Sequence, residues 1–317
     1  MQYRRLGASG LRVSVIGLGG NTFGRYVDEQ QTAQVVGAAL DAGVNFFDTA
    51  NIYSDGASEQ YLGKALHGIR EQALIATKLG MRMGPGPNDT GSSRKHIVAS
   101  VHASLRRLDI DYIDLLQIHK FDPDTPLEET LSALDDLVRA GDVRYIGCSQ
   151  YDAWRMTQAL WISDKRNLAA FVSAQAEYNL LAREIERDLI PACLEFGVGV
   201  IPFYPLAAGV LTGKYMPDRP APEQTRGYNN PDFAPRLNRA DLETTQRLDI
   251  WARGHGHNVA ELALAWLVAQ PAVATVIAGV RTPAQVAANA RAGEWALTPD
   301  DLHAIDSVLA TPSAQPA

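Results

Sequence analysis

The sequence predicts an α/β fold, a parallel (β/α)8 TIM barrel formed by a single domain over residues 1–317. Eight short apolar runs alternate with stretches whose apolar residues recur every three or four positions. Such alternation is typical of a parallel sheet covered by helices. The length of 317 residues and a hydrophobic content of 46% also suit one barrel of this kind.

The elements follow in order from the N-terminus. The opening MQYRRLGASGLRVS has a Gly-Ala-Ser-Gly turn between two short extended segments, so we expect an N-terminal β-hairpin. The eight strands are then predicted at VSVIGLGG, NFFDTA, ALIATK, IDLLQIH, VRYIGCSQ, FVSAQAEYN, VGVIPFY and VATVIAG. The clearest helices are QTAQVVGAALDAG, RKHIVASVHASLRRL, LEETLSALDDLVRAG and ELALAWLVAQ, and we expect extra helices besides.

A doubly wound open sheet is the competing fold. Such a sheet usually carries a glycine-rich fingerprint between its first strand and first helix. The segment VIGLGGNTFG contains glycines, but their spacing does not fit that fingerprint, and residues 25–27 separate it from the next helix. The barrel is therefore the preferred prediction.

Two other segments stand outside this alternation. Residues 216–239 form a long connection rich in Pro, Asn and Arg after the seventh predicted strand, and a connection of that length is more often functional than accidental. Residues 311–317 are expected to be a flexible tail.

Charge and composition exclude several classes of partner. The net charge is −7 and the pI about 5.5, with no long basic run, which argues against nucleic acid and anionic membranes. No apolar segment reaches the ~20 residues of a membrane span, and no secretory signal is evident. Cys148 and Cys193 are too few for a disulfide framework. We therefore expect a cytoplasmic protein with a small-molecule substrate, and the oligomeric state stays open.

Four polar residues lie where predicted strands end. Asp48, Lys78 and His119 each end an apolar strand, and Tyr53 follows the strand of Asp48. The carboxyl ends of barrel strands form the active site in proteins of this fold, so these side chains are expected to meet. A buried charge at such positions is costly unless it is paired.

The four residue types suit proton delivery. A lysine ammonium beside a tyrosine favours the phenolate and lowers the phenol pKa from about 10. An aspartate keeps that lysine charged, and a histidine can orient a carbonyl group. The set contains no activated nucleophile. It therefore predicts a site that protonates a carbonyl while a hydride donor reduces it.

With these residues in view, the sequence resembles the aldo-keto reductases over nearly its whole length. The resemblance is carried by GVNFFDTANIYSDGASEQYLGKAL, LIATK, SLRRLDIDYIDLLQIH, VRYIGCSQY, QAEYNLL, PLAAGVLTGKY and IAGVRTPAQVAANA. It implies NADP(H)-dependent reduction of an aldehyde or ketone. It also implies that Tyr53 is the general acid, that Lys78 and Asp48 tune it, and that His119 orients the carbonyl.

The same resemblance implies a set of cofactor-binding residues. The positions expected at the nicotinamide are Ser149, Gln150 (where the family usually has Asn), Gln175 and the stacking Phe203. Those expected at the pyrophosphate are Leu206, Gly209, Leu211 and Lys214, and those at the adenosine and its 2′-phosphate are Gly279, Arg281, Gln285 and Asn289. Asn21 and Thr22 are candidates near the ribose, and Phe23, Tyr26, Tyr228 and Phe233 for the substrate pocket.

Three alternatives stay open at this stage. Lys78 could form a Schiff base, as in an aldolase barrel. The chain could be an NADP-binding regulatory or channel-associated subunit, a kind of protein that the resemblance includes. His119 could be a metal ligand, but no partner cluster with ligand spacing accompanies it, so no metal is expected.

Overall fold

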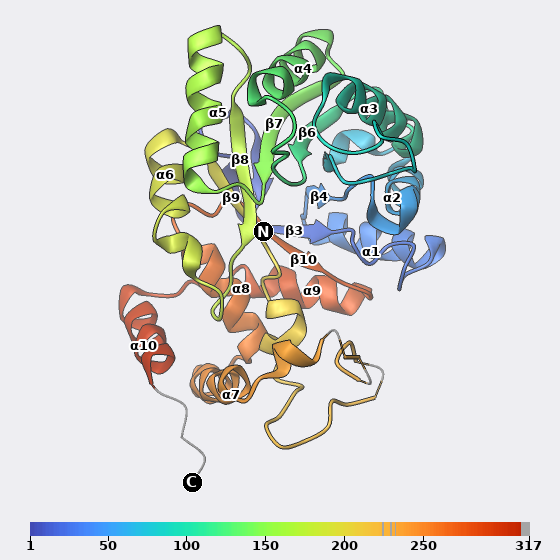
Figure 1. Cartoon of the computed structure of the whole chain (residues 1–317). Coiled ribbons are helices and arrows are strands. Elements are labelled where there is room, and N and C mark those ends of the chain that lie inside the picture. Colours follow the sequence, from blue (N-terminus) through green and yellow to red (C-terminus); the bar gives the residue numbers. More distant parts are fainter. Residues whose placement is uncertain (224, 229, 232, 312–317) are drawn as a thin grey trace.

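A parallel eight-stranded sheet forms the centre of the structure, a computed structural model that describes residues 1–223, 225–228, 230–231 and 233–311. Its strands follow one another in the spatial order β10-β3-β4-β5-β6-β7-β8-β9 (Figure 1). Their bounds are β3 (Ile16–Gly19), β4 (Phe46–Asp48), β5 (Leu74–Leu79), β6 (Ile113–Ile118), β7 (Val143–Ser149), β8 (Phe171–Glu177), β9 (Gly199–Phe203) and β10 (Val276–Gly279).

The sheet closes between its two end strands. The backbone N–H of Val200 in β9 donates to the carbonyl oxygen of Ala272 at 2.8 Å, and that of Ala274 donates to Val200 at 2.9 Å. Ala272 and Ala274 both lie just before β10, so these bonds join the two end strands of the sheet. The predicted (β/α)8 barrel is therefore confirmed, and each of the eight predicted apolar runs overlaps one of its strands.

Helices surround the barrel (Figure 1). After the first six strands come α1 (Glu29–Asp41), α2 (Ala57–Leu66), α3 (Arg94–Leu108), α4 (Leu127–Ala140), α5 (Ala153–Arg166) and α6 (Leu189–Phe196), and after them α8 (Val259–Ala269) and α9 (Pro283–Ala292). The expected extra helices are α7 (Arg239–Gly254) and α10 (Pro299–Ala310), which contact each other. Short 3-10 helices are η1 (Tyr53–Gly56), η2 (Arg70–Gln72), η3 (Glu184–Glu186), η4 (Ala207–Thr212) and η5 (Ala234–Leu237).

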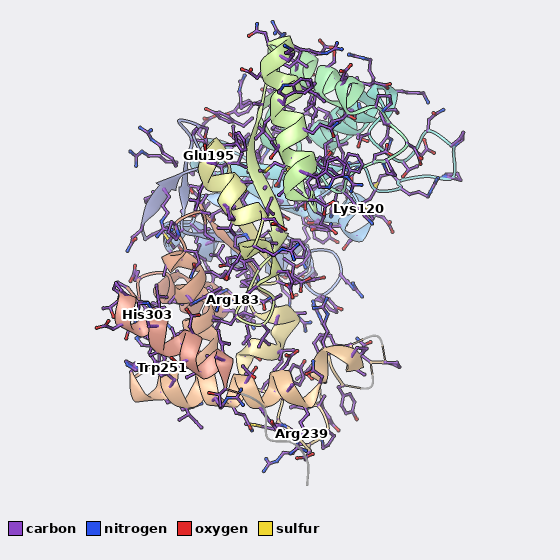
Figure 2. The ribbon with its side chains drawn as sticks, turned by 60° about the vertical axis from the view of Figure 1, so that its left-hand side comes forward. Lys120, Arg183, Glu195, Arg239, Trp251 and His303 are labelled. Carbon is purple, nitrogen blue, oxygen red and sulfur yellow. The ribbon has the colours of Figure 1, made fainter. Side chains whose placement is uncertain are left out.

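Local sequence explains where several helices begin. Asp28 accepts a hydrogen bond from the backbone N–H of Gln31 at 2.8 Å, and the Gln31 side chain accepts from the backbone of Asp28, which completes a capping box at α1. Asn258 and Thr298 make the same arrangement at α8 and α10. α10 is further held by Arg183, labelled in Figure 2, whose guanidinium donates to Asp306 at 2.6 Å. None of the helices in the described ranges is long and apolar enough to cross a membrane.

The predicted N-terminal hairpin is confirmed and packs against the end of the barrel at which the strands begin. β1 (Tyr3–Arg5) and β2 (Arg12–Ser14) pair antiparallel. Leu6 and Val13 are fully buried and pack in one cluster with Phe46 inside the barrel. Gly7 has φ +58°, and a Cβ there would lie 2.5 Å from the carbonyl oxygen of Gly197. The hairpin therefore closes the end of the barrel opposite the carboxyl ends of the strands.

The long connection over residues 216–239 folds back on the barrel. The Tyr215 hydroxyl accepts a hydrogen bond from the backbone N–H of Gly227 at 3.1 Å, and its ring packs 5.8 Å from that of Phe233. The connection contains η5 and ends where α7 begins. Apart from Thr311, the expected tail lies outside the described residues.

Candidate active site

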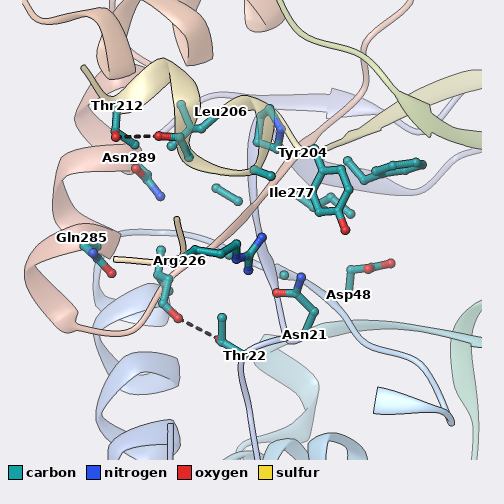
Figure 3. A pocket seen from close by; sticks show the side chains of 18 of the residues that line it. Asn21, Thr22, Asp48, Tyr204, Leu206, Thr212, Arg226, Ile277, Gln285 and Asn289 are labelled. Carbon is teal, nitrogen blue, oxygen red and sulfur yellow. Dashed lines mark hydrogen bonds between the residues drawn. The ribbon is translucent and has the colours of Figure 1, made fainter. Parts of the chain in front are cut away.

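A cavity of about 860 Å³ opens at the carboxyl ends of the barrel strands (Figure 3). Asp48, Tyr53 and His119 line it, and Figure 3 shows Asp48 on the side opposite Gln285 and Asn289 of α9. The cavity is thus an elongated groove. It lies on the face of the barrel that carries the active site in proteins of this fold. Its dimensions suit a large extended ligand rather than a small metabolite alone.

Lys78 is the centre of a buried polar cluster. Its Nζ donates to Asp48 Oδ1 at 2.5 Å and to the Thr49 carbonyl oxygen at 2.8 Å, and it lies 3.5 Å from the Tyr53 hydroxyl. Lys78 is fully buried, and an ammonium has three hydrogens, so each hydrogen has one acceptor. The predicted cluster of Asp48, Tyr53 and Lys78 is assembled.

The pKa of Lys78 follows from these contacts. Burial disfavours its charge, but the nearby Asp48 carboxylate and the Tyr53 hydroxyl more than offset that effect, so its pKa is raised. Lys78 is therefore an ammonium at neutral pH. A charged, fully hydrogen-bonded amine is a poor nucleophile.

The pKa of Tyr53 differs from the sequence expectation. Burial raises it and Lys78 lowers it, and burial is the larger effect, so the net pKa lies above the ordinary value. The expectation of a lowered pKa was wrong because sequence reasoning did not include the loss of solvent around the phenol. Tyr53 is therefore protonated at neutral pH, in the form that a proton donor requires.

His119 directly follows β6 and is electrically neutral. Burial and the neighbouring Lys78 ammonium lower its pKa to about 3. Its ring meets that of Tyr53 edge to face, with centroids 5.9 Å apart. Its Nδ1 is buried and has no partner among the residues described. A neutral imidazole beside the phenol can donate one N–H to an oxygen in the cavity.

Gln117 is a site residue that sequence reasoning missed. Its Nε2 donates to Asp48 Oδ2 at 3.2 Å, and Gln175 Nε2 donates to the same oxygen at 2.9 Å. Gln175 Nε2 also lies 3.4 Å from Gln117 Oε1. The signal was present, because Gln117 stands two positions before His119 and alternate strand residues share a face.

These contacts set the orientation of the Gln175 amide. Both hydrogens of its nitrogen are directed at buried acceptors, whereas a flipped amide would place its oxygen against the Asp48 carboxylate. Gln175 lines the cavity, so the amide group that remains to bind a ligand there is the carbonyl oxygen. That oxygen suits an NH2 donor.

A second buried pair fixes the segment that carries Tyr53. Glu59 is fully buried in α2, accepting from Thr77 Oγ1 at 2.6 Å and from Arg107 Nε at 2.7 Å. Thr77 is the neighbour of Lys78 in β5, so Glu59 links the helix that follows Tyr53 to the strand of Lys78. Ser54 and Asp55, which lie between Tyr53 and α2, adopt left-handed backbone conformations with φ of 51° and 54°.

The rest of the cavity is lined by most of the expected cofactor residues. Those that line it are Asn21, Thr22, Ser149, Gln150, Gln175, Phe203, Leu206, Gly209, Lys214, Gly279, Arg281, Gln285 and Asn289. Leu211 does not line the cavity. It is fully buried in the hydrophobic core, because the turns of η4 direct its side chain inward.

Comparison of the sequence with known proteins identifies its family. The sequence model of the Aldo/keto reductase family matches residues 15–310. The chain belongs to the aldo/keto reductase family. It is 37% identical to a "Probable voltage-gated potassium channel subunit beta" of Arabidopsis thaliana, covering 100% of this chain and 99% of the relative.

Other relatives have enzyme names. An "L-glyceraldehyde 3-phosphate reductase" of Escherichia coli O157:H7 is 33% identical, over 98% of this chain and 93% of the relative. A "Versiconal hemiacetal acetate reductase" of Aspergillus parasiticus is 33% identical, over 96% of each. The family assignment supports an oxidoreductase.

In this aldo/keto reductase a smaller cavity of about 430 Å³ also borders Tyr53 and shares several lining residues with the larger cavity. Tyr26 and Phe233 line it, and their place in a substrate pocket stays a prediction. Phe23 and Tyr228 line neither cavity. Phe23 is fully buried against the core, because a turn at Gly20 directs its ring inward, and Tyr228 is 42% exposed.

Sequence reasoning also missed several residues of the smaller cavity. Tyr204, Arg25, Arg226 and Arg236 line it together with Tyr53. Tyr204 follows β9 with φ +52°, and its ring packs edge to face against Phe203 at 5.2 Å. The two chain segments that carry the arginines are loops, whose placement strand periodicity does not predict. Within the described ranges no three His, Cys, Asp or Glu side chains gather as metal ligands would.

Proposed function

We propose that this aldo/keto reductase reduces an aldehyde or ketone to the alcohol with NADPH, in a reversible reaction. One observation carries the proposal: a protonated phenol lines the cavity 3.5 Å from a buried ammonium and beside a neutral imidazole. That arrangement delivers a proton to an oxygen without offering a nucleophile.

Each side chain then has a defined task. When bound, the dinucleotide supplies the hydride. The His119 N–H orients the carbonyl oxygen, and Tyr53 donates its proton to that oxygen. The Lys78 ammonium stabilises the phenolate that remains, since an opposite charge at contact distance favours the ionised form. Asp48 balances the charge of Lys78 in the buried site.

The lining of the elongated cavity fits a phosphorylated dinucleotide. Lys214 and Arg281 place cations along the groove, and Arg281 stands just before the N-terminus of α9, where anions are favoured. The Gln175 carbonyl oxygen faces the cavity near Tyr53 and suits the NH2 of a carboxamide. Cations beside a helix N-terminus favour NADP over NAD, because the 2′-phosphate adds negative charge.

The test is turnover with a matched variant. The wild-type protein should oxidise NADPH in the presence of 4-nitrobenzaldehyde or methylglyoxal. Tyr53→Phe should lower kcat by at least about 100-fold, while its Kd for NADPH changes by less than about threefold. Equal loss of binding and turnover would contradict the role given to Tyr53.

A regulatory function is the second candidate, and the channel-subunit relative favours it. A protein of that kind would bind NADPH in the same groove and turn over aldehydes poorly. Tight NADPH binding without measurable oxidation across aldehydes, ketoses and steroid-like ketones would favour this candidate.

A Schiff-base lyase using Lys78 is disfavoured by the structure, because all three ammonium hydrogens of Lys78 have buried acceptors. Borohydride should therefore trap no substrate adduct on this chain.

A further inference from the structure

The smaller cavity beside Tyr53 has an unusual charge. We propose that the carbonyl substrate carries an anionic group, a phosphate or a carboxylate, that binds Arg25 and Arg236 while its carbonyl oxygen meets Tyr53. This inference rests on the proposed reductase function and names the substrate class for it. It is drawn from the lining of the 430 Å³ cavity.

The lining brings three arginines together from distant segments. Arg25 follows β3, and Arg226 and Arg236 come from the long connection before α7. No aspartate or glutamate lines this cavity in the part of the chain that the structure describes. A cavity walled by charges of one sign concentrates ligands of the opposite sign. The protein as a whole carries −7, so this local excess of positive charge is not a general property of its surface.

The guanidinium groups of Arg25 and Arg236 lie over tyrosine rings. Arg25 lies 5.0 Å from the ring centre of Tyr26, and Arg236 lies 5.2 Å from that of Tyr204. A guanidinium stacked on a ring keeps its N–H edges available for planar, two-point recognition of carboxylate or phosphate. The two tyrosines also line the cavity, so both groups are held at its wall.

The positive charges of the three arginines are not balanced by strong ion pairs with carboxylates of the described residues. Arg236 Nη1 lies 3.3 Å from Glu177 Oε1, but both side chains are more than a third exposed, and such pairs are weak. Arg25 and Arg226 have no carboxylate oxygen within 4.0 Å among the described residues. An anionic substrate group would supply the missing counter-charge.

Arg226 and Arg236 line both cavities. The Arg226 side chain points into the elongated groove in Figure 3, where it can meet a cofactor phosphate. Arg25 lines only the smaller cavity. The substrate assignment therefore depends first on Arg25, and NADPH binding by the Arg236 variant has to be measured beside its substrate preference. A volume of 430 Å³ is near the small end of ligand cavities, which favours a short substrate.

The experiment compares substrates that differ only in charge. Wild type, Arg25→Gln and Arg236→Gln would be assayed with 4-carboxybenzaldehyde against 4-nitrobenzaldehyde, and with glyceraldehyde 3-phosphate against glyceraldehyde. The two pairs separate carboxylate from phosphate recognition. Arg219→Gln is the matched control, because Arg219 lies on the same connection, removes the same charge and lines neither cavity.

We expect wild type to prefer the anionic member of at least one pair in kcat/KM. Each of Arg25→Gln and Arg236→Gln should reduce that preference about tenfold, the size of a charge-assisted hydrogen bond, and Arg219→Gln should leave it unchanged. The preference should also shrink as salt is added.

Three results would overturn the proposal. They are a wild type without preference in either pair, variants that lose charged and neutral turnover equally, and variants that weaken NADPH binding while the preference stays constant. A wild type that reduces none of the four aldehydes would instead contradict the reductase function itself.

Discussion

Gln175 donates a hydrogen bond to Asp48, with 2.9 Å between Gln175 Nε2 and Asp48 Oδ2. Asp48 in turn accepts from Lys78, which contacts the Tyr53 hydroxyl. The Gln175 amide thus faces the groove with its oxygen and the cluster of Asp48, Lys78 and Tyr53 with its nitrogen. A ligand that binds the Gln175 oxygen would contact a side chain that is hydrogen-bonded to this cluster.

Gln117→Met should loosen this amide. Methionine has a similar volume but neither donates to Asp48 nor accepts from Gln175, so the Gln175 side chain would lose one of its two fixing contacts. We expect the affinity ratio of NADP⁺ to its 3-acetylpyridine analogue, in which a methyl replaces the carboxamide NH2, to fall by about threefold or more. Fluorescence titration measures both affinities.

The control for that change is Gln158→Met, which alters an exposed residue of α5. It should leave the ratio as it is in wild type. An unchanged ratio in Gln117→Met would show that Gln175 needs no support from Gln117.

The pH dependence of both reaction directions follows from the shifted pKa values. Tyr53 has a pKa above its ordinary value of about 10 and is protonated below it, while His119 stays neutral above about pH 3. Reduction should therefore vary little in kcat across neutral pH and decline only as Tyr53 loses its proton in alkaline solution. Oxidation needs the phenolate, so its kcat should rise with pH over the same range.

Lys78→Met should move the alkaline limb of the reduction profile upward, because Lys78 lowers the Tyr53 pKa. It should also lower kcat at pH 7. Rates of both directions over a pH series measure these effects. A Lys78→Met profile that coincides with that of wild type would contradict the coupling.

Glu59→Gln should destabilise the fold. The change leaves Arg107 without its carboxylate in a site where Glu59 is fully buried and Arg107 is 20% exposed. We expect the free energy of unfolding, from urea titration, to fall by roughly 3 kcal/mol. Glu128→Gln removes an exposed partner of Arg166 and should cost less than about 0.5 kcal/mol. Similar losses in both variants would contradict this difference.

Gly7→Ala and Gly10→Ala form a matched pair in the N-terminal hairpin. At Gly7 the backbone is left-handed and a Cβ would meet carbonyl oxygens at 2.5 Å, whereas a Cβ at Gly10 has open space around it. Gly7→Ala should lower the free energy of unfolding by ~2 kcal/mol or more, and Gly10→Ala should change it by less than ~0.5 kcal/mol. Equal values would show that the hairpin adjusts at no cost.

The strand positions, and the meeting of the polar side chains at the strand ends, could be predicted from the sequence because both depend on short-range pattern. The alternation of apolar runs and helices predicts the barrel. In a barrel the carboxyl ends of the strands lie together on one face, independently of the loop conformations. The prediction that Asp48, Lys78 and His119 share one site therefore requires no measured distance between them. Tyr53 lies five positions after Asp48, so it could not be far away.

Other features depended on information that no local pattern contains. The net effect on the Tyr53 pKa required knowing how much solvent surrounds the phenol. Phe23 and Tyr228 were assigned to the pocket because they are aromatic residues of rim loops, but one faces the core and the other faces solvent. Arg25 and Arg236 are more than 200 positions apart, and only the folded loops bring them to one cavity.

All three acceptors around the Lys78 ammonium come from residues 48–53. The proposed proton donor and its charged neighbours thus come from one short stretch plus a single amine from the adjacent strand. The groups that would select a substrate come from segments on other sides of the rim. We expect that lengthening or exchanging those segments redirects the proposed reductase to new compounds and leaves the residues proposed to transfer the proton unchanged.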